Sequence, residues 1–154
     1  MKREEQQALL KKLNWKEGMK GSLLHPPQAF AGLLEDAGEL PGDEREPLDF
    51  LLAFARREEE VVRIMAEWKG KLGADPLIWF SYPKKSSPLY QKGNITRDQG
   101  WGALGEAGFE PVRQVALDED WSALRFRKAG KIGKMTRNLE MALSEEGRAR
   151  SGKA

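Results

Sequence analysis

Residues 48–71 read LDFLLAFARREEEVVRIMAEWKGK, and this stretch decides the fold class. Its opening part, residues 48–55, is an almost unbroken apolar run, which is typical of a strand buried on both faces in a parallel sheet. Residues 56–71 follow with Val61, Met65 and Trp68 at helical spacing, and three glutamates in the first turn favour a helix through its dipole. A buried strand followed at once by an amphipathic helix predicts an α/β protein.

The residues on both sides of this stretch continue the alternation of helices and strands. Pro26 and Pro27 have no backbone N–H to donate to a strand ladder, so the first predicted strand ends before them. The short link Asp118-Glu119-Asp120 joins the last two predicted strands in an antiparallel hairpin. We predict strands over residues 19–25, 77–82, 111–117 and 121–127. We predict helices over residues 3–13, from Pro27 to Gly38, over 97–107 with Thr96 as N-cap, and near 134–144.

These elements define the predicted architecture. Strands that alternate with helices imply right-handed crossovers and a parallel sheet. We expect a Rossmann-like, three-layer α/β fold on a short mixed sheet of five strands, three parallel and two in a terminal antiparallel hairpin. An amino-terminal helix precedes the sheet and a basic carboxyl-terminal helix follows it. In this interpretation residues 1–128 form a single domain, and residues 129–154 form a basic tail that is helical or frayed.

Composition excludes several classes of function. The 154-residue chain has no cysteine, so a thiolate nucleophile and a cysteine-ligated zinc site are excluded. Its single histidine, His25, excludes a multi-histidine metal site. The start, MKREEQQALLKKLNW, is too charged for a secretory signal, and no apolar run approaches the ~20 residues of a membrane span. We therefore expect a cytoplasmic protein with no membrane partner.

Charge is distributed unevenly along the chain. The net charge is only +2, but residues 125–154 hold nine lysines and arginines against three acidic residues. Such a segment attracts polyanions, and its composition equally fits a solvated terminus. Contact with a nucleic-acid backbone through this tail is therefore one open hypothesis.

Several segments of the chain resemble a known architecture. They are KEGMKGSLLHPPQAF (residues 16–30), PLDFLLAF (47–54), LIWFSYPKKSS (77–87), ITRDQGW (95–101) and VRQVALDEDWSALRFR (112–127). Over residues 11–128 the chain is similar to a group of small uncharacterised bacterial proteins whose sheet looks like a truncated class I methyltransferase sheet. The resemblance implies the spatial strand order first, second, third, fifth, fourth, and it implies no established activity.

The chain departs from true class I methyltransferases where the methyl donor would bind. In that family a glycine-rich turn after the first strand lets the backbone approach the donor closely. Here the turn is His25-Pro26-Pro27-Gln28, which has no glycine and lacks two backbone donors. The family's ribose-binding carboxylate ends a second strand, and we predict no such strand between Gly38 and Pro47. We interpret the donor site as lost, and a degenerate methyltransferase-like protein stays an alternative.

The candidate binding site lies where the parallel strands end, because ligands of open α/β sheets bind beyond the carboxyl ends of the strands. The turn Pro83-Lys84-Lys85-Ser86-Ser87 offers two lysines and two hydroxyls near a predicted helix start, which suits a phosphate or a carboxylate. A solvated loop is the alternative, and the glycines of a phosphate-binding P-loop are missing. The predicted binding residues are His25, Lys84, Lys85, Ser86, Ser87 and Arg97.

Other residues near this site have competing interpretations. His25 is either a general base or anion contact, or a histidine that is hydrogen-bonded to a neighbouring carbonyl. The acidic turn at residues 118–120 either attracts a hard cation or is simply solvated. Tyr82 and Trp121 either belong to the core or line a pocket at the sheet edge.

The sequence contains no complete catalytic or cofactor motif. We therefore predict a non-catalytic binding or interaction module with an anion site, and we expect no cofactor and no metal. One alternative is an enzyme that uses His25 with Lys84 and Lys85 on a phosphorylated or carboxylated metabolite. The others are a degenerate methyltransferase-like protein and a nucleic-acid-associated protein, and the fold alone cannot choose between them.

Overall fold

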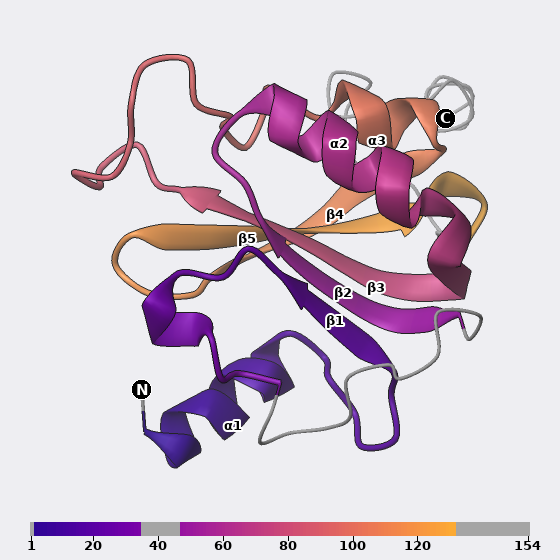
Figure 1. The fold of residues 1–154 in the computed structure, drawn as a ribbon, viewed down its shortest axis with the longest axis horizontal. Coiled ribbons are helices and arrows are strands. Elements are labelled where there is room, and N and C mark those ends of the chain that lie inside the picture. The colour runs from indigo at the N-terminus through magenta and orange to yellow at the C-terminus, as the bar shows by residue number, and fades with distance from the viewer. Residues whose placement is uncertain (1, 35–46, 132–154) are drawn as a thin grey trace.

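The computed structural model describes residues 2–34 and 47–131 of the chain. Figure 1 shows helix α1 on one side of a sheet and helices α2 and α3 on the other, which gives three layers. The helices are α1 (Arg3–Lys12), α2 (Glu58–Trp68) and α3 (Gly102–Glu106), with 3-10 turns at Gln28–Phe30, Lys69–Lys71 and Ala129–Lys131. The strands are β1 (Gly21–Leu24), β2 (Leu48–Phe54), β3 (Leu72–Pro83), β4 (Phe109–Ala116) and β5 (Trp121–Lys128).

The strands form one mixed sheet in the order β1-β2-β3-β5-β4. β2 is parallel to both β1 and β3, whereas β5 is antiparallel to both β3 and β4. The predicted fold class and the predicted insertion of the fifth strand between the third and the fourth are therefore confirmed. Because β4 runs in the same direction as β3, the ends of β1 to β4 and the start of β5 share one end of the sheet, called here the carboxyl end.

The apolar run that decides the fold is buried as predicted. Every residue of β2 except Asp49 is buried, because helices cover both faces of the sheet at this strand. β3 begins earlier than predicted, and its register against β2 shifts: Leu48 pairs with Leu72, but Phe50 pairs with Leu77. This irregularity accommodates Pro76, which has no backbone N–H to donate.

Two apolar clusters join the layers. One lies between the sheet and the α2–α3 layer and includes Val61 and Trp101. The other lies between the sheet and α1 and includes Leu13 and Trp79. The indole N–H of Trp79 donates a 3.0 Å hydrogen bond to the carbonyl of Leu13, just after the end of α1. The amino-terminal helix is therefore part of this domain's own core.

The helix predicted over residues 97–107 is wrong in its first half. Only Gly102–Glu106 is helical, and Thr96 is not its N-cap. Thr96 and Gln99 form an isolated β-bridge, and Gly100 has a φ of 102°, a left-handed conformation that an α-helix excludes. The indole N–H of Trp101 donates to the carbonyl of Thr96 at 2.8 Å, which ties this turn to the start of α3.

The helix predicted after Pro27 is a 3-10 turn at Gln28–Phe30 in the described part of the chain. Its apolar stripe is buried as predicted, with Phe30, Leu33 and Leu34 in the core. Residues 35–46 and the helix predicted near 134–144 lie outside the described residues.

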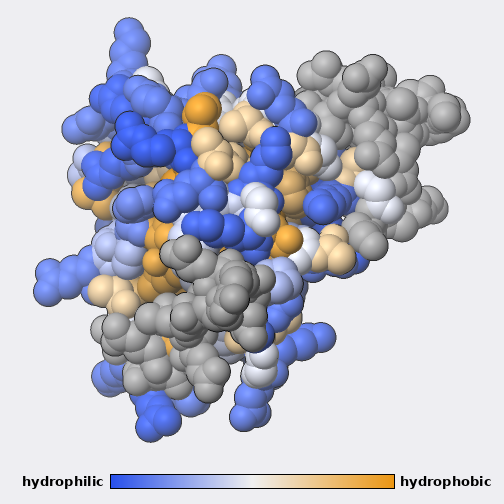
Figure 2. Space-filling model, turned by 45° about the vertical axis from the view of Figure 1, so that its right-hand side comes forward, coloured by the Kyte–Doolittle hydropathy of each residue, from blue (hydrophilic) through white to orange (hydrophobic). Residues whose placement is uncertain are grey.

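The described surface is mostly hydrophilic. Figure 2 shows polar side chains over most of the face that it draws, with apolar residues in small patches between them. Among the described residues, Val62 on α2 is the exposed large hydrophobic side chain, at 47%. No helix in the described ranges is long and apolar enough to cross a membrane.

Candidate functional site

A cavity of about 250 Å³ lies at the carboxyl end of the sheet, beyond the end of β3. Lys84 and Lys85 line it from the loop that follows β3, and Arg97 lines it from the turn before α3. Asp98 is the one carboxylate among its described lining residues. The cavity therefore collects three cationic groups against one acidic group, from segments that are separate in the sequence.

Uncharged polar side chains from three strands line the same cavity. They are Tyr82 on β3, Gln114 on β4 and Ser122 on β5. The side-chain amide of Gln114 donates to the hydroxyls of both Tyr82 and Ser122, each at 2.9 Å. These residues meet because Tyr82 lies opposite Ser122 in the ladder, and Ser122 lies opposite Ala116, whose side chain shares a face with that of Gln114.

Tyr82 is a buried phenol at the wall of this cavity. Burial raises the pKa of Tyr82 above its ordinary value, and the hydrogen bond with Ser122 and the positive charge of Arg97 oppose this rise only in part. Tyr82 therefore keeps its proton at neutral pH, and its hydroxyl remains able to donate a hydrogen bond.

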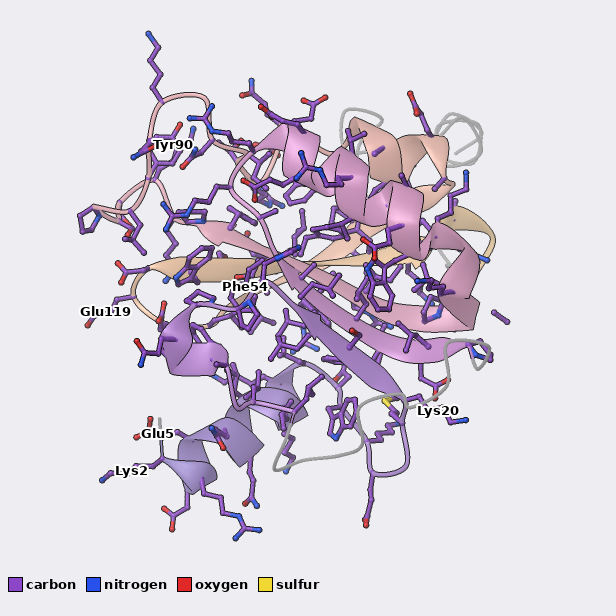
Figure 3. All side chains as sticks on the ribbon, in the orientation of Figure 1. Lys2, Glu5, Lys20, Phe54, Tyr90 and Glu119 are labelled. Carbon is purple, nitrogen blue, oxygen red and sulfur yellow. The ribbon has the colours of Figure 1, made fainter. Side chains whose placement is uncertain are left out.

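The two lysines are carried by a loop that is fastened to the β4–β5 hairpin turn. The Ser87 hydroxyl donates to the Asp120 carboxylate at 2.7 Å, and the Lys84 N–H donates to the Asp120 carbonyl at 2.8 Å. Ser87 Oγ also accepts a 3.0 Å hydrogen bond from the N–H of Leu89. In Figure 3 the hairpin turn, marked by Glu119, and the loop after β3, marked by Tyr90, lie at the same end of the molecule.

The acidic turn at residues 118–120 uses its carboxylates within the protein. Asp118 Oδ1 accepts from the N–H groups of Asp120 and Trp121, both at 2.8 Å, and Asp120 Oδ1 accepts from Ser87. Glu119 is exposed. The described ranges contain no group of three or more histidine, cysteine, aspartate or glutamate residues arranged to hold a metal ion.

The structure brings together three of the six predicted binding residues. Lys84, Lys85 and Arg97 line the cavity. Ser86 is exposed on the same loop but is not among the described lining residues, and Ser87 is buried in its hydrogen bond to Asp120. His25 is exposed after β1 and likewise lies outside the described lining.

The turn after β1 has no glycine, but one of its residues adopts a backbone conformation that is typical of glycine. His25 has a φ of 52°, in the left-handed region that glycine adopts freely and that costs other residues energy. Pro26 and Pro27 follow it without backbone donors. β1 is an edge strand of the described sheet: β2 lies on one side of it, and no described strand lies on the other side.

Six lining residues were not among the predicted binding residues: Tyr82, Pro83, Thr96, Asp98, Gln114 and Ser122. Of these, Tyr82 has a pocket at the sheet edge as one of its two alternative interpretations. Whether Gln114 and Ser122 face the cavity depends on the residue-by-residue pairing of β4 and β5, and the bounds of the two predicted strands did not define that pairing.

Trp121 belongs to the core. It is 5% exposed, and its ring packs edge-on against Phe54, with ring centres 5.3 Å apart. The guanidinium of Arg56 lies 5.6 Å from the centre of the Trp121 ring, at a cation–π distance. Arg56, the first basic residue after β2, therefore packs on Trp121 and is not among the described residues of the cavity wall.

Comparison with known proteins identifies the fold. No protein-family model matches the chain, and no curated protein matches it. The chain is similar to a SAM-dependent methyltransferase from Aquifex aeolicus, with 13% identity, a TM-score of 0.55, and coverage of 79% of this chain and 88% of that one. It is also similar to a protein from Sulfolobus solfataricus described as a type 11 methyltransferase, with 13% identity, a TM-score of 0.51, and coverage of 86% and 96%.

These likenesses concern the fold alone, because the identities are low. The chain has the Rossmann-like α/β fold of class I methyltransferases, built here on an open five-stranded mixed sheet. Since one fold hosts many functions, the function depends on the side chains that line the cavity.

Proposed function

We propose that this chain is a non-catalytic binding module that holds a small phosphorylated or carboxylated molecule in the cavity beyond β3. One observation carries the proposal: Lys84, Lys85 and Arg97 line a single cavity whose other polar groups include Tyr82 and Gln114. Cationic donors form the stronger, shorter hydrogen bonds to phosphate and carboxylate oxygens, and neutral donors orient the ligand.

The charges of the cavity favour an anionic ligand. Within the described part of the chain, Lys84, Lys85 and Arg97 form no ion pair, and Asp98 is the one acidic lining residue. Like charges that gather at one cavity repel one another, and a bound anion relieves this repulsion. The proposed ligand therefore neutralises charge that the described lining leaves uncompensated.

The size of the cavity favours a small ligand. Its volume of about 250 Å³ lies just below the range of roughly 300–1,000 Å³ that is usual for sites of drug-sized molecules. A phosphorylated or carboxylated metabolite of few atoms fits this space better than a dinucleotide does.

The residues of the cavity favour binding over catalysis. The described lining contains neither histidine nor cysteine, and Tyr82, whose ordinary pKa of 10.0 is raised further by burial, is protonated at neutral pH. An enzyme that used His25 with the two lysines would need them at one place, and His25 is not among the described lining residues. General acid–base catalysis requires a proton-transferring group within hydrogen-bond reach of the reacting atoms.

Titration calorimetry at constant ionic strength tests this proposal. The probes are inorganic phosphate, citrate and a panel of small phosphorylated metabolites. We expect at least one probe to bind the unaltered chain, and we expect Lys84→Ala/Lys85→Ala to weaken it about tenfold or more through loss of two charge-assisted contacts. The control is Lys92→Ala, an exposed lysine of the same loop that is not among the lining residues. If no probe binds, or if the double variant binds as well as the control, the proposal is wrong.

Methyl transfer is the second candidate function, and the likeness to methyltransferase folds favours it. Against it stands the turn His25-Pro26-Pro27, where two residues lack the N–H groups that a donor site uses. Calorimetry with S-adenosylmethionine decides between the two. Saturable binding that His25→Ala weakens would support a donor site, and absence of heat would retire this candidate.

A further inference from the structure

The sheet carries a second group of cationic side chains, away from the cavity. Arg113 on β4 lies directly opposite Arg125 on β5, and Arg127 follows two residues later on β5, so all three share one face. This is the face that α1 covers elsewhere, because Arg125 also pairs with Trp79 of the cluster beneath α1. The cavity residue Tyr82 belongs to the cluster on the other face.

The carboxylates near this group lie beside Arg127. Asp75 of β3 accepts two hydrogen bonds from the Arg127 guanidinium, at 3.1 and 2.7 Å. Glu110 is fully buried and lies opposite Arg127 in the ladder. Arg113 and Arg125 form no ion pair within the described residues. The pair of opposed arginines therefore faces like charge across the ladder, an arrangement that destabilises a sheet.

The side chain of Arg125 contains a buried hydrogen-bond donor. Its Nε has no hydrogen-bond partner among the described residues. Burial of Arg125 and the charges of Arg127 and Arg113 lower the pKa of Arg125, although Asp75 opposes this shift. A buried donor without a partner costs stability, and a bound anion or water molecule that accepts its hydrogen bond removes this cost.

We propose that Arg113 and Arg125 together bind one phosphate group on this face of the sheet, at a site independent of the cavity. Guanidinium groups present planar pairs of donors that match phosphate oxygens. Two guanidinium groups that come from neighbouring strands can each engage different oxygens of a tetrahedral phosphate, which carries more acceptor oxygens and more negative charge than a carboxylate. The bound group neutralises the charges of two arginines that face each other across the ladder.

Thermal unfolding in low-salt buffer, with inorganic phosphate against chloride at equal ionic strength, tests the proposal. The background is Lys84→Ala/Lys85→Ala, which separates this site from the cavity. We expect phosphate to raise the unfolding midpoint in this background and Arg113→Gln to abolish the increase. Without phosphate, Arg113→Gln should leave the midpoint unchanged or raise it, because it removes a like-charge pair. The control, Arg63→Gln on the exposed surface of α2, should keep the response.

The outcomes are distinguishable. Equal phosphate responses in Arg113→Gln and in the control would overturn the proposal. If Arg113→Gln does not fold, Arg113→Lys replaces it, and it should retain the charge but weaken phosphate binding about tenfold through loss of the planar fork. A short single-stranded oligonucleotide identifies the source of the phosphate. Tighter binding of the oligonucleotide than of inorganic phosphate, lost in Arg113→Gln, assigns the site to nucleic-acid backbone, and equal binding assigns it to a free phosphate compound.

Discussion

Ser87 and Asp120 are 33 residues apart in the sequence, yet the hydroxyl of Ser87 donates a 2.7 Å hydrogen bond to the carboxylate of Asp120. The backbone N–H of Lys84 donates to the carbonyl of the same aspartate. The loop that carries Lys84 and Lys85 is therefore held by the hairpin turn, and the cavity walls from β3 and β5 are linked. Ser87 thus positions the proposed binding residues without lining the cavity itself.

Removal of this hydrogen bond should affect both stability and binding. We expect Ser87→Ala to lower the free energy of unfolding by about 1–3 kcal/mol, since the hydrogen bond has a charged acceptor. Urea denaturation measures this loss, and calorimetry with the best anionic probe should show weaker binding because the lysine loop is less fixed. Ser86→Ala, an exposed neighbour, is the control and should change neither quantity. Unchanged stability and affinity in Ser87→Ala would show that the loop is held by other contacts.

The raised pKa of Tyr82 predicts a loss of stability at high pH. The ordinary pKa of 10.0 applies in the unfolded chain, and the folded pKa lies above it. Between these two values the unfolded state loses the proton first, so the free energy of unfolding falls as pH rises above about 10, by at most about 1.4 kcal/mol per pH unit for this group. Urea denaturation between pH 9 and 11 should show a smaller slope in Tyr82→Phe than in the unaltered chain. The reference is Tyr90→Phe, and equal slopes in all three proteins would contradict the prediction.

The hydrogen bond between Trp79 and Leu13 predicts a strong effect of a conservative substitution. Trp79→Phe leaves the Leu13 carbonyl without its 3.0 Å donor and opens space in a fully buried site. We expect the free energy of unfolding to fall by about 2–4 kcal/mol, from the lost partner and the added cavity together. Trp68→Phe, on the half-buried end of α2, should cost less in the same urea experiment. Equal losses would mean that α1 contributes little to the stability of the domain.

A comparison of substitutions at two glycines distinguishes the cost of backbone strain from the cost of steric collision. Gly100 and Gly93 both have left-handed φ values, 102° and 91°. A Cβ at Gly100 would collide with the side chain of Ile95, whereas a Cβ at Gly93 meets no atom within 4 Å. We expect Gly93→Ala to cost about 1–2 kcal/mol from conformation alone and Gly100→Ala to cost more. Thermal or urea unfolding of both variants checks the order, and a smaller loss for Gly100→Ala would contradict it.

The sheet could be predicted from the sequence because its signals are local. The apolar run at residues 48–55 and the run at 77–82 are too short for helices and too uniform for exposed strands. The turn at Gly100 could not be predicted, since it depends on the bridge between Thr96 and Gln99 and on the indole of Trp101. The helical spacing of apolar residues in 97–107 does not indicate these tertiary contacts.

The candidate site could be predicted only where its residues follow a strand. Lys84 and Lys85 come directly after β3, and they could be predicted because ligands bind at the carboxyl ends of parallel strands. Gln114 and Ser122 could not be found, because a shift of one residue in hairpin register would place their side chains on the other face. The role of Ser87 depends on Asp120, which lies in the β4–β5 hairpin turn and is 33 residues away in the sequence, and no local pattern reveals this partner.

Both borders of the described sheet end in features that discourage further strand pairing. β1 is only four residues long and is followed at once by His25 in a left-handed conformation and by Pro26. At the opposite border, β4 contains Pro111 at a register shift and the charged Arg113. Unpaired strand edges recruit the edges of other molecules, and short length, proline, bulges and charge all oppose this recruitment. An open sheet of this kind can therefore remain dispersed at high protein concentration instead of growing into fibrils or edge-to-edge aggregates.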